Sequence, residues 1–248
     1  MQHPLARPHP ASRLVALAAC LATLLVALPA PRADAADPAL SYVWTYQPAT
    51  HQLVGNLGTY PFKIQGGTPV VDADGVPAVK FTTPTSLGLY TAAASTFYRP
   101  GTQDFAWQAV MSLDYLRPKS TANVAQYGLW NGAQIKLQIG RTGVPECHFN
   151  GTNGRTKVVA TAYGSINDGG RKHAFTCWRD GNVLGVTVDC VSSTTTFDLG
   201  AVNPTTKPTF GNRGPKGGAE DQLYGTFWSY AVSIGPEASP PACPVPST

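Results

Sequence analysis

The residues that could do acid–base chemistry are few and scattered along the chain. The 248 residues include 14 Asp and Glu and 5 His. A glycoside hydrolase needs two carboxylates facing one glycosidic bond, because one attacks or activates water while the other donates a proton. Glu146, Glu220 and Glu237 are the only glutamates, and no E-x-D-x-x-E cluster occurs. The sequence therefore offers no catalytic carboxylate pair.

Other catalytic arrangements are also incomplete. Polysaccharide lyases group Arg, Gln, His and Tyr around a uronate, and Gln134-Ile135-Lys136 resembles their Gln-Ile-His except that the basic residue differs. His148 and His173 could meet across adjacent strands, although a histidine in a strand is more often structural. A G-x-S-x-G nucleophile elbow is absent from the sequence. No catalytic residue is assigned, and an extracellular polysaccharide-degrading enzyme (glycoside hydrolase or polysaccharide lyase) remains the alternative to a binding protein.

The N-terminus determines which chemistry the cysteines can have. Arg7 and Arg13 precede an apolar run from Leu14 to Leu28, and Ala33-Asp34-Ala35 has the small-x-small pattern of a signal-peptidase site. The run is short for a membrane span. Leu17-Ala18-Ala19-Cys20 resembles a lipoprotein box, but the apolar run continues beyond it. We therefore expect residues 1–35 to be a signal peptide and the protein to be secreted, with no membrane contact after cleavage.

Cleavage at this site would leave an even number of cysteines, namely Cys147, Cys177, Cys190 and Cys243. An even number in an oxidising compartment predicts disulfides rather than a free catalytic thiol. A zinc site would want closely spaced pairs such as C-x-x-C, and none occurs. Two disulfides are the expectation.

The composition of the mature chain narrows its partners. Cleavage removes Arg7, Arg13, Arg32 and Asp34. The number of basic residues therefore falls from 18 to 15, and the number of acidic residues falls from 14 to 13. A net charge near +2 without a Lys/Arg cluster in the sequence argues against a nucleic-acid partner. It also predicts that ligand binding depends only slightly on salt, because long-range attraction is small.

Short runs of period two, rich in Val, Thr, Phe and Tyr, alternate with Gly, Pro, Asn and Asp along the mature chain. This pattern predicts strands and excludes long helices. The clearest strands are 42–47, 78–82, 105–115, 134–139, 146–150, 157–162, 172–179, 183–189 and 223–234. We expect an all-β, antiparallel two-sheet jelly-roll sandwich over residues 36–235, followed by a Pro-rich tail at 236–248.

Alternation along the strands sorts their side chains into two faces. The odd positions of 105–115 are mostly large and apolar, which places Trp107 in the core. Phe175 and Cys177 share one face of their strand, and Thr176 and Trp178 take the opposite face. Asp180-Gly181 is a strong short-turn signal, so residues 173–189 form two antiparallel strands joined by a tight turn.

Three strings of residues carry a family resemblance. They are "GLWNGAQIKLQIG" (128–140), "INDGGRKHAFTCWRDGNVLGVTVDC" (166–190) and "PTFGNRGPKGGAEDQLYGTFWSYAVSI" (208–234). Together they resemble the LamG-like, concanavalin A-like lectin/glucanase domains of secreted bacterial proteins, over residues 70 to 235. The resemblance implies the jelly-roll fold more than any one function.

The resemblance also implies a disulfide pattern. Members of the group often carry cysteines at the places of Cys147 and Cys177, so these two are expected to pair. Where many members have Val-Asp-Gly, this chain has Val188-Asp189-Cys190. A thiol therefore replaces a turn glycine, and the tail supplies Cys243 as its expected partner.

A calcium site is a weaker implication of the same resemblance. Calcium-binding relatives gather acidic or amide ligands after the Gly211-Asn212 strand end, and here only Glu220 and Asp221 provide carboxylates. Calcium prefers six to eight oxygen ligands. We expect no cofactor, with Glu220 and Asp221 as the metal ligands if calcium binds. Asp72 and Asp74 are interpreted as a solvated turn.

The remaining chemistry belongs to the aromatic residues. Sugars bind to aromatic faces with help from neighbouring amides. Trp130 with Asn131 and Gln134, and separately Trp178, are the candidate ligand-binding residues, while Trp228 is either a surface residue or a core residue. Asn150-Gly151-Thr152 matches a glycosylation acceptor, but Asn-Gly is first a turn signal. The sequence predicts a non-enzymatic carbohydrate-binding or adhesive protein whose partner is an extracellular glycan or a cell surface.

Overall fold

The computed structural model describes residues 40–56, 59–213, 221–236 and 238. All of them belong to one compact unit. Sixteen strands occur in the described part, with one short 3₁₀ turn at Ala94–Thr96. No helix there is long and apolar enough to span a membrane.

The strands follow one another in short segments. They are β1 (Leu40–Gln47), β2 (Gln52–Gly55), β3 (Phe62–Gln65), β4 (Thr68–Val71), β5 (Pro77–Phe81), β6 (Leu87–Tyr90), β7 (Phe105–Ser112), β8 (Ala122–Gly128), β9 (Gln134–Ile139), β10 (Pro145–Gly151), β11 (Gly154–Val159), β12 (Lys172–Asp180), β13 (Val183–Val188), β14 (Val191–Thr196), β15 (Thr209–Phe210) and β16 (Gly225–Ile234).

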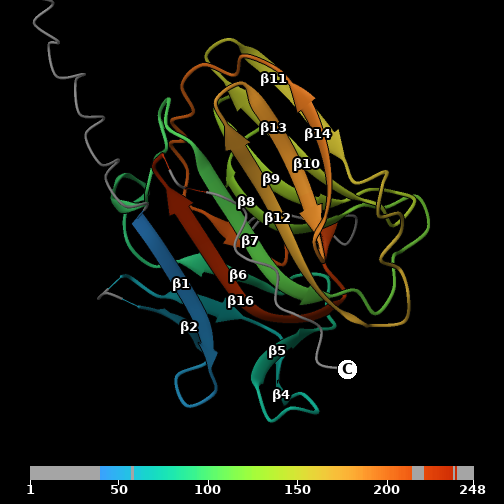
Figure 1. The fold of residues 1–248 in the computed structure, drawn as a ribbon. Helices are drawn as coiled ribbons and strands as arrows, with labels where there is room; N and C mark the ends of the chain where they lie inside the picture. The colour runs from blue at the N-terminus through green and yellow to red at the C-terminus, as the bar shows by residue number, and fades with distance from the viewer. Residues whose placement is uncertain (1–39, 57–58, 214–220, 237, 239–248) are drawn as a thin grey trace, which may run out of the picture. The chain divides into compact units, whose positions relative to one another are not determined.

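Antiparallel pairing joins the strands in the order β11-β10-β9-β8-β15-β6-β3-β2-β1-β16-β7-β12-β13-β14 (Figure 1). One layer contains β11, β10, β9, β8, β15, β6 and β3. The other layer contains β1, β16, β7, β12, β13 and β14. β2 connects them, and β5 pairs with β16 beside the path. The layers face each other where β9 and β10 contact β12 and β13. This arrangement confirms the expected all-β, antiparallel jelly-roll sandwich.

The core lies between the layers because alternate side chains of each strand point inward. In β9, Ile135, Leu137 and Ile139 are buried, as their period-two spacing predicts. Trp107 is fully buried on β7, which confirms its assignment to the core. Large aromatic side chains from both layers, including Trp44, Phe62 and Phe149, complete the core.

The predicted hairpin at residues 173–189 is confirmed. β12 and β13 pair from Phe175 opposite Val188 to Asp180 opposite Val183. The two residues between them are Gly181 and Asn182, so the turn lies one residue later than the Asp-Gly pair itself. Gly181 has a φ of 55°, which glycine adopts without steric cost.

The strand predicted at residues 157–162 is placed too late. β11 spans Gly154–Val159 because β10 and β11 are joined by a two-residue turn at Thr152 and Asn153, with Gly151 opposite Gly154. Thus Asn150-Gly151-Thr152 leads into a hairpin turn, as its first interpretation predicts.

Candidate functional site

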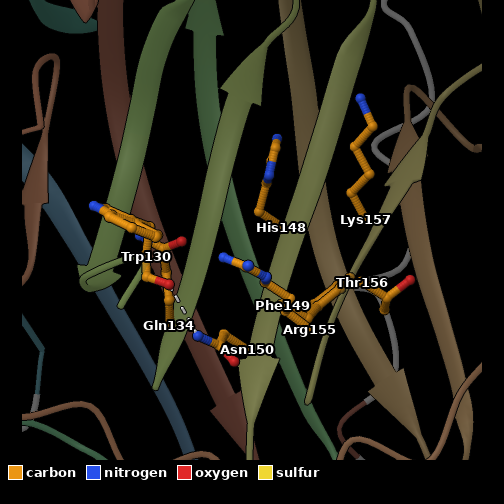
Figure 2. Close-up of a pocket in the computed structure, with 8 residues that line it drawn as sticks. All are labelled: Trp130, Gln134, His148, Phe149, Asn150, Arg155, Thr156 and Lys157. Atoms are coloured by element: carbon orange, nitrogen blue, oxygen red, sulfur yellow. Dashed lines mark hydrogen bonds between the residues drawn. The ribbon is translucent and has the colours of Figure 1, made fainter. Parts of the chain in front are cut away.

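A pocket of about 300 Å³ opens on the outer face of β9, β10 and β11. Figure 2 shows its side chains projecting from these strands and from the turn between β8 and β9. Its lining residues are Trp130, Gln134, His148, Phe149, Asn150, Arg155, Thr156 and Lys157. The pocket therefore joins an aromatic ring, amides and cationic side chains on one face of the sheet.

Strand register places the polar side chains in rows. Gln134 lies opposite Asn150 on β10, and Asn150 lies opposite Arg155 on β11. One step along, Lys136 lies opposite His148, which lies opposite Lys157. Directly opposed residues of neighbouring strands have Cβ atoms about 4.5–5.5 Å apart. The rows thus form one continuous polar surface.

Trp130 is the most exposed tryptophan that the structure describes, with 69% of its surface accessible. The Asn150 side chain shapes the turn that carries it, because Asn150 Nδ2 donates to the carbonyls of Trp130 at 3.1 Å and of Gly132 at 2.5 Å. The Arg155 guanidinium lies 5.8 Å from the centre of the Trp130 ring. The indole is thus presented to solvent from a turn anchored to β10.

One carboxylate lies next to the pocket, on the same row of outward positions. Glu146 Oε2 is 2.9 Å from His148 Nε2 and 3.5 Å from Lys157 Nζ. The hydrogen bond with His148 lowers the pKa of Glu146, and burial opposes this shift. Glycoside hydrolysis needs a second carboxylate. No carboxylate is among the residues that line the pocket itself.

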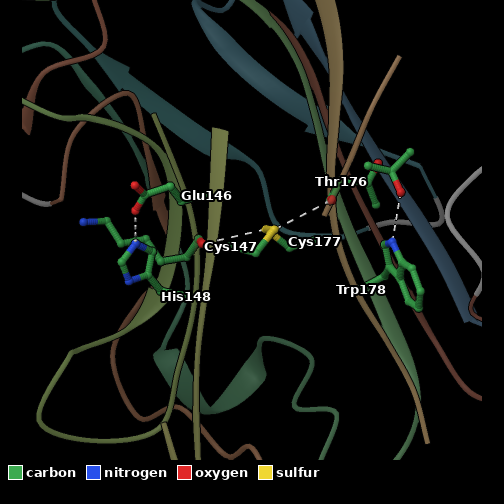
Figure 3. Close-up of a disulfide and its surroundings, with 8 residues drawn as sticks. Glu146, Cys147, His148, Thr176, Cys177 and Trp178 are labelled. Carbon is green, nitrogen blue, oxygen red and sulfur yellow. Dashed lines mark hydrogen bonds and ion pairs between the residues drawn. A yellow bond between two sulfur atoms is a disulfide. The ribbon is translucent and has the colours of Figure 1, made fainter. Parts of the chain in front are cut away.

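The structure brings together only part of the predicted ligand-binding set. Trp130 and Gln134 line the pocket, and the exposed Asn131 lies in the same turn. Trp178 lies on the other layer, where its ring covers Gly185 and its Nε1 donates to Thr187 Oγ1 at 2.9 Å. Figure 3 shows Trp178 pointing away from the interior, on the side opposite to His148. One pocket therefore cannot contain both rings.

Arg155 and Lys157 are the two Lys/Arg side chains of the pocket wall, and no sequence motif identifies them. Their alternation with Thr156 places both on the outward face of β11. The sequence signal was present in "RTK", but the register with β10 was needed to place them beside Trp130.

Only one of the two predicted metal ligands, Asp221, lies within the described residues. Asp221 Oδ2 pairs with Arg213 Nε at 3.0 Å, whereas Glu220 lies outside the described residues. No group of three or more His, Cys, Asp or Glu side chains able to hold a metal occurs in the described part of the chain. Calcium binding stays a prediction.

Asp72 belongs to a turn, as expected, but it is not left to solvent alone. Its carboxylate accepts from the backbone N–H groups of Asp74 and Val76 and from Lys172 and Trp228. The hydrogen bond from Lys172 is the largest of the effects that lower the pKa of Asp72 to about 2. Trp228 is buried at 8% exposure, with the Lys172 ammonium 4.9 Å from the centre of its ring.

His173 lies in a second ionisable cluster, and it does not meet His148. The ring is 1% exposed, with Nδ1 2.7 Å from Asp189 Oδ2 and Nε2 3.1 Å from Asp168 Oδ2. Tyr163 donates to Asp189 at 2.7 Å. The expectation that the histidines could meet was wrong, because His148 lines the pocket on the outer face of β10, whereas His173 is buried on β12, on the same strand face as Cys177.

The predicted disulfide between Cys147 and Cys177 is present and joins β10 to β12 across the two layers (Figure 3). Cys190 is also disulfide-bonded. Its expected partner, Cys243, lies outside the described residues. Asp189 and Cys190 have φ values of 43° and 78°, so Cys190 does occupy a left-handed backbone position that favours glycine.

Comparison with known proteins identifies the fold but no family. No family model and no curated protein matches the sequence. The binding domain of botulinum neurotoxin serotype D is similar over 77% of this chain and 46% of its own, at 12% identity and a TM-score of 0.55. A Trypanosoma rangeli sialidase in complex with sialic acid is similar over 78% of this chain and 30% of its own, at 16% identity and a TM-score of 0.55. The chain spans less than half the length of both, and it shares with them the concanavalin A-like jelly-roll fold.

Proposed function

We propose that the mature protein is secreted and binds an extracellular glycan in the pocket beside Trp130, without catalysing a reaction. The observation that carries this proposal is the exposed indole next to Gln134 and Asn150. Aromatic rings bind the C–H faces of sugars, and amides hydrogen-bond the hydroxyls. The fold is consistent with this role, because it is shared with a toxin domain described as receptor-binding and with a sialidase that holds sialic acid.

Secretion is supported by the apolar segment at 14–28 and by the disulfide between Cys147 and Cys177. Expression of the full sequence in a secreting bacterial host, followed by N-terminal sequencing of the protein from the medium, tests it. We expect the mature protein to begin at Ala36. A chain retained in the cytoplasm with Met1 would contradict this part of the proposal.

Ligand binding is tested on a glycan array with the secreted protein, with and without EDTA. The best ligand is then measured with Trp130→Ala. Loss of one stacking ring should cost about 1–3 kcal/mol, if sugar stacking is comparable to the stacking of bases on aromatic side chains. Trp178→Ala is the matched control, because it removes the same side chain from the outer face of the other layer. Binding that is unchanged by Trp130→Ala would contradict the proposed site.

The enzymatic alternative is tested on the same material. We expect no release of reducing ends from glucan or xylan, because the pocket lacks a pair of carboxylates. We expect none from alginate either, because the pocket lining has no tyrosine to complete the Arg, Gln, His and Tyr group of a lyase. Release above background that is abolished by replacing Glu146 or His148 would favour a degrading enzyme instead.

A further inference from the structure

We propose that the ligand of the Trp130 pocket is an acidic glycan, one whose sugar rings carry carboxylate or sulfate groups. This inference rests on the proposed function, because it names the ligand class of the same pocket. Four observations support it. The outer face of β9, β10 and β11 carries an excess of positive charge, and Arg155 on this face has no ion pair among the described residues. Lys136 is largely enclosed, and the nearby carboxylate of Glu146 already contacts other side chains.

Cationic side chains concentrate on this face although the chain as a whole is nearly balanced. Lys136, Arg155 and Lys157 lie on the outward rows of β9 and β11, with the ionisable His148 between them on β10. Glu146 is the one carboxylate in the corresponding positions of these three strands. The local excess of positive charge attracts an anion, and the walls of a pocket reduce its screening by salt.

Arg155 holds its charge toward the pocket without a partner of opposite charge. No hydrogen bond or ion pair of its guanidinium is found among the described residues, and its one contact of this kind is with the face of Trp130. A cation–π contact orients the guanidinium while its N–H donors remain available. A planar carboxylate or sulfate can accept two of these donors at once.

Lys136 extends the cationic surface beyond the pocket wall. It lies between Gln126 and His148 in the register of the sheet, and its ammonium has no hydrogen bond within the described structure. Burial lowers the pKa of Lys136, with Arg213 acting in the same direction and Asp221 and Glu146 opposing it. An anionic ligand would offset the cost of this burial.

Glu146 does not neutralise the face, because its carboxylate is already engaged. It contacts His148 and Lys157 through the same oxygen. Arg213 and Asp221 pair with each other. Arg155 and Lys136 therefore remain as the two cations whose charge is not matched by a neighbouring carboxylate contact.

The test compares three soluble polymers with the secreted protein: polygalacturonate, which carries carboxylates, dextran sulfate, which carries sulfate esters, and neutral dextran. Binding is measured by calorimetry at low and at high NaCl. We expect at least one acidic polymer to bind about tenfold or more tightly than dextran, and its affinity to fall as salt rises. This replaces the slight salt dependence expected from the net charge of the chain, because the cations are concentrated on one face. The polymer that binds identifies the anionic group.

Arg155→Gln is the decisive variant, because Arg155 is exposed and its replacement leaves the core intact. We expect it to weaken binding of the acidic polymer about tenfold or more, and Lys136→Met to weaken it as well. Arg117→Gln is the matched control: it removes the same charge from an exposed position in the β7–β8 connection.

The outcomes separate this inference from the proposed function. Equal affinity for dextran and the acidic polymers, lost in Trp130→Ala but not in Arg155→Gln, would overturn the acidic class and leave glycan binding intact. Equal losses in Arg117→Gln and Arg155→Gln would also overturn it, since attraction would then be non-specific. Absence of binding to these polymers and to every glycan on the array would overturn both.

Discussion

Two groups of ionisable side chains lie on opposite layers of the sandwich and differ in how they are paired. In the His173 group the ionisable side chains are paired with one another. The two ring nitrogens contact Asp189 and Asp168, and the Tyr163 hydroxyl contacts both His173 and Asp189. Around Trp130, Arg155 has no ion pair among the described residues. Because buried polar groups are costly unless they are paired, the first group is organised for stability. The second has unused hydrogen-bonding capacity, as a binding surface requires.

The first prediction concerns the disulfide that connects the two regions. Replacing Cys147 and Cys177 together by Ser should lower the free energy of unfolding by about 3–4 kcal/mol, because the unfolded chain regains the entropy of a loop of 30 residues. Urea denaturation of the double variant measures this loss. An unchanged midpoint would mean that the bridge does not stabilise the sandwich.

The second prediction is that the His173 group can be damaged without a direct effect on the pocket. His173→Ala removes a buried ring and leaves the hydrogen-bonding groups of Asp168 and Asp189 without it. We expect a loss of about 2–3 kcal/mol in unfolding free energy. The affinity for the glycan, measured below the melting temperature, should stay within twofold. A specific loss of binding in a folded variant would show that the two regions are coupled.

The third prediction is that the pocket can be altered without an effect on stability. Arg155→Gln and Trp130→Ala should change the free energy of unfolding by less than about 0.5 kcal/mol, because both side chains are exposed. Thermal melts of both variants beside the wild-type protein provide the measurement. If Arg155→Gln destabilised the protein as much as His173→Ala, the distinction between the two groups would fail.

The last prediction concerns the pH dependence of stability that the His173 group contributes. Burial alone would raise the pKa of Asp189, but hydrogen bonds from His173, Tyr163 and the Ala174 N–H outweigh it and lower the pKa below the usual 3.8. The resulting stabilisation is present above pH 3.8 and is lost as the pH falls through the lower folded-state pKa.

Asp189→Asn should therefore lower the melting temperature at neutral pH, and the difference from wild type should shrink under acid conditions. Melts from pH 7 to pH 2 measure this difference. A gap that stays constant over that range would show that the charge of Asp189 does not contribute to stability.

Alternation along single strands allowed much of the fold to be predicted. The assignment of Trp107 to the core and the sharing of one face by Phe175 and Cys177 both followed from period-two spacing, and both are confirmed. β14 (Val191–Thr196) was not predicted, because its hydroxyl-rich sequence lacks an apolar face and its side chains are mainly exposed or half-buried. Its position is determined by pairing with β13.

The candidate site was predicted only in part. Trp130 and Gln134 lie close together in sequence, so one turn and one strand were enough to associate them. Arg155 is far from both along the chain and lies beside Trp130 only through the register of β9, β10 and β11. Trp178 shares the residue type of Trp130, but it belongs to the other layer.

The sequence by itself determined the fold class, the core-facing residues of its clearest strands and the two cysteines whose disulfide joins the layers. These features follow from local alternation and, for the cysteines, from the family resemblance. Only the tertiary structure decided which polar side chains share a surface and which remain unpaired. The physical reason is that a period of two specifies the face of a strand, whereas the neighbour across the sheet depends on register and on strand order, which are properties of the whole sheet.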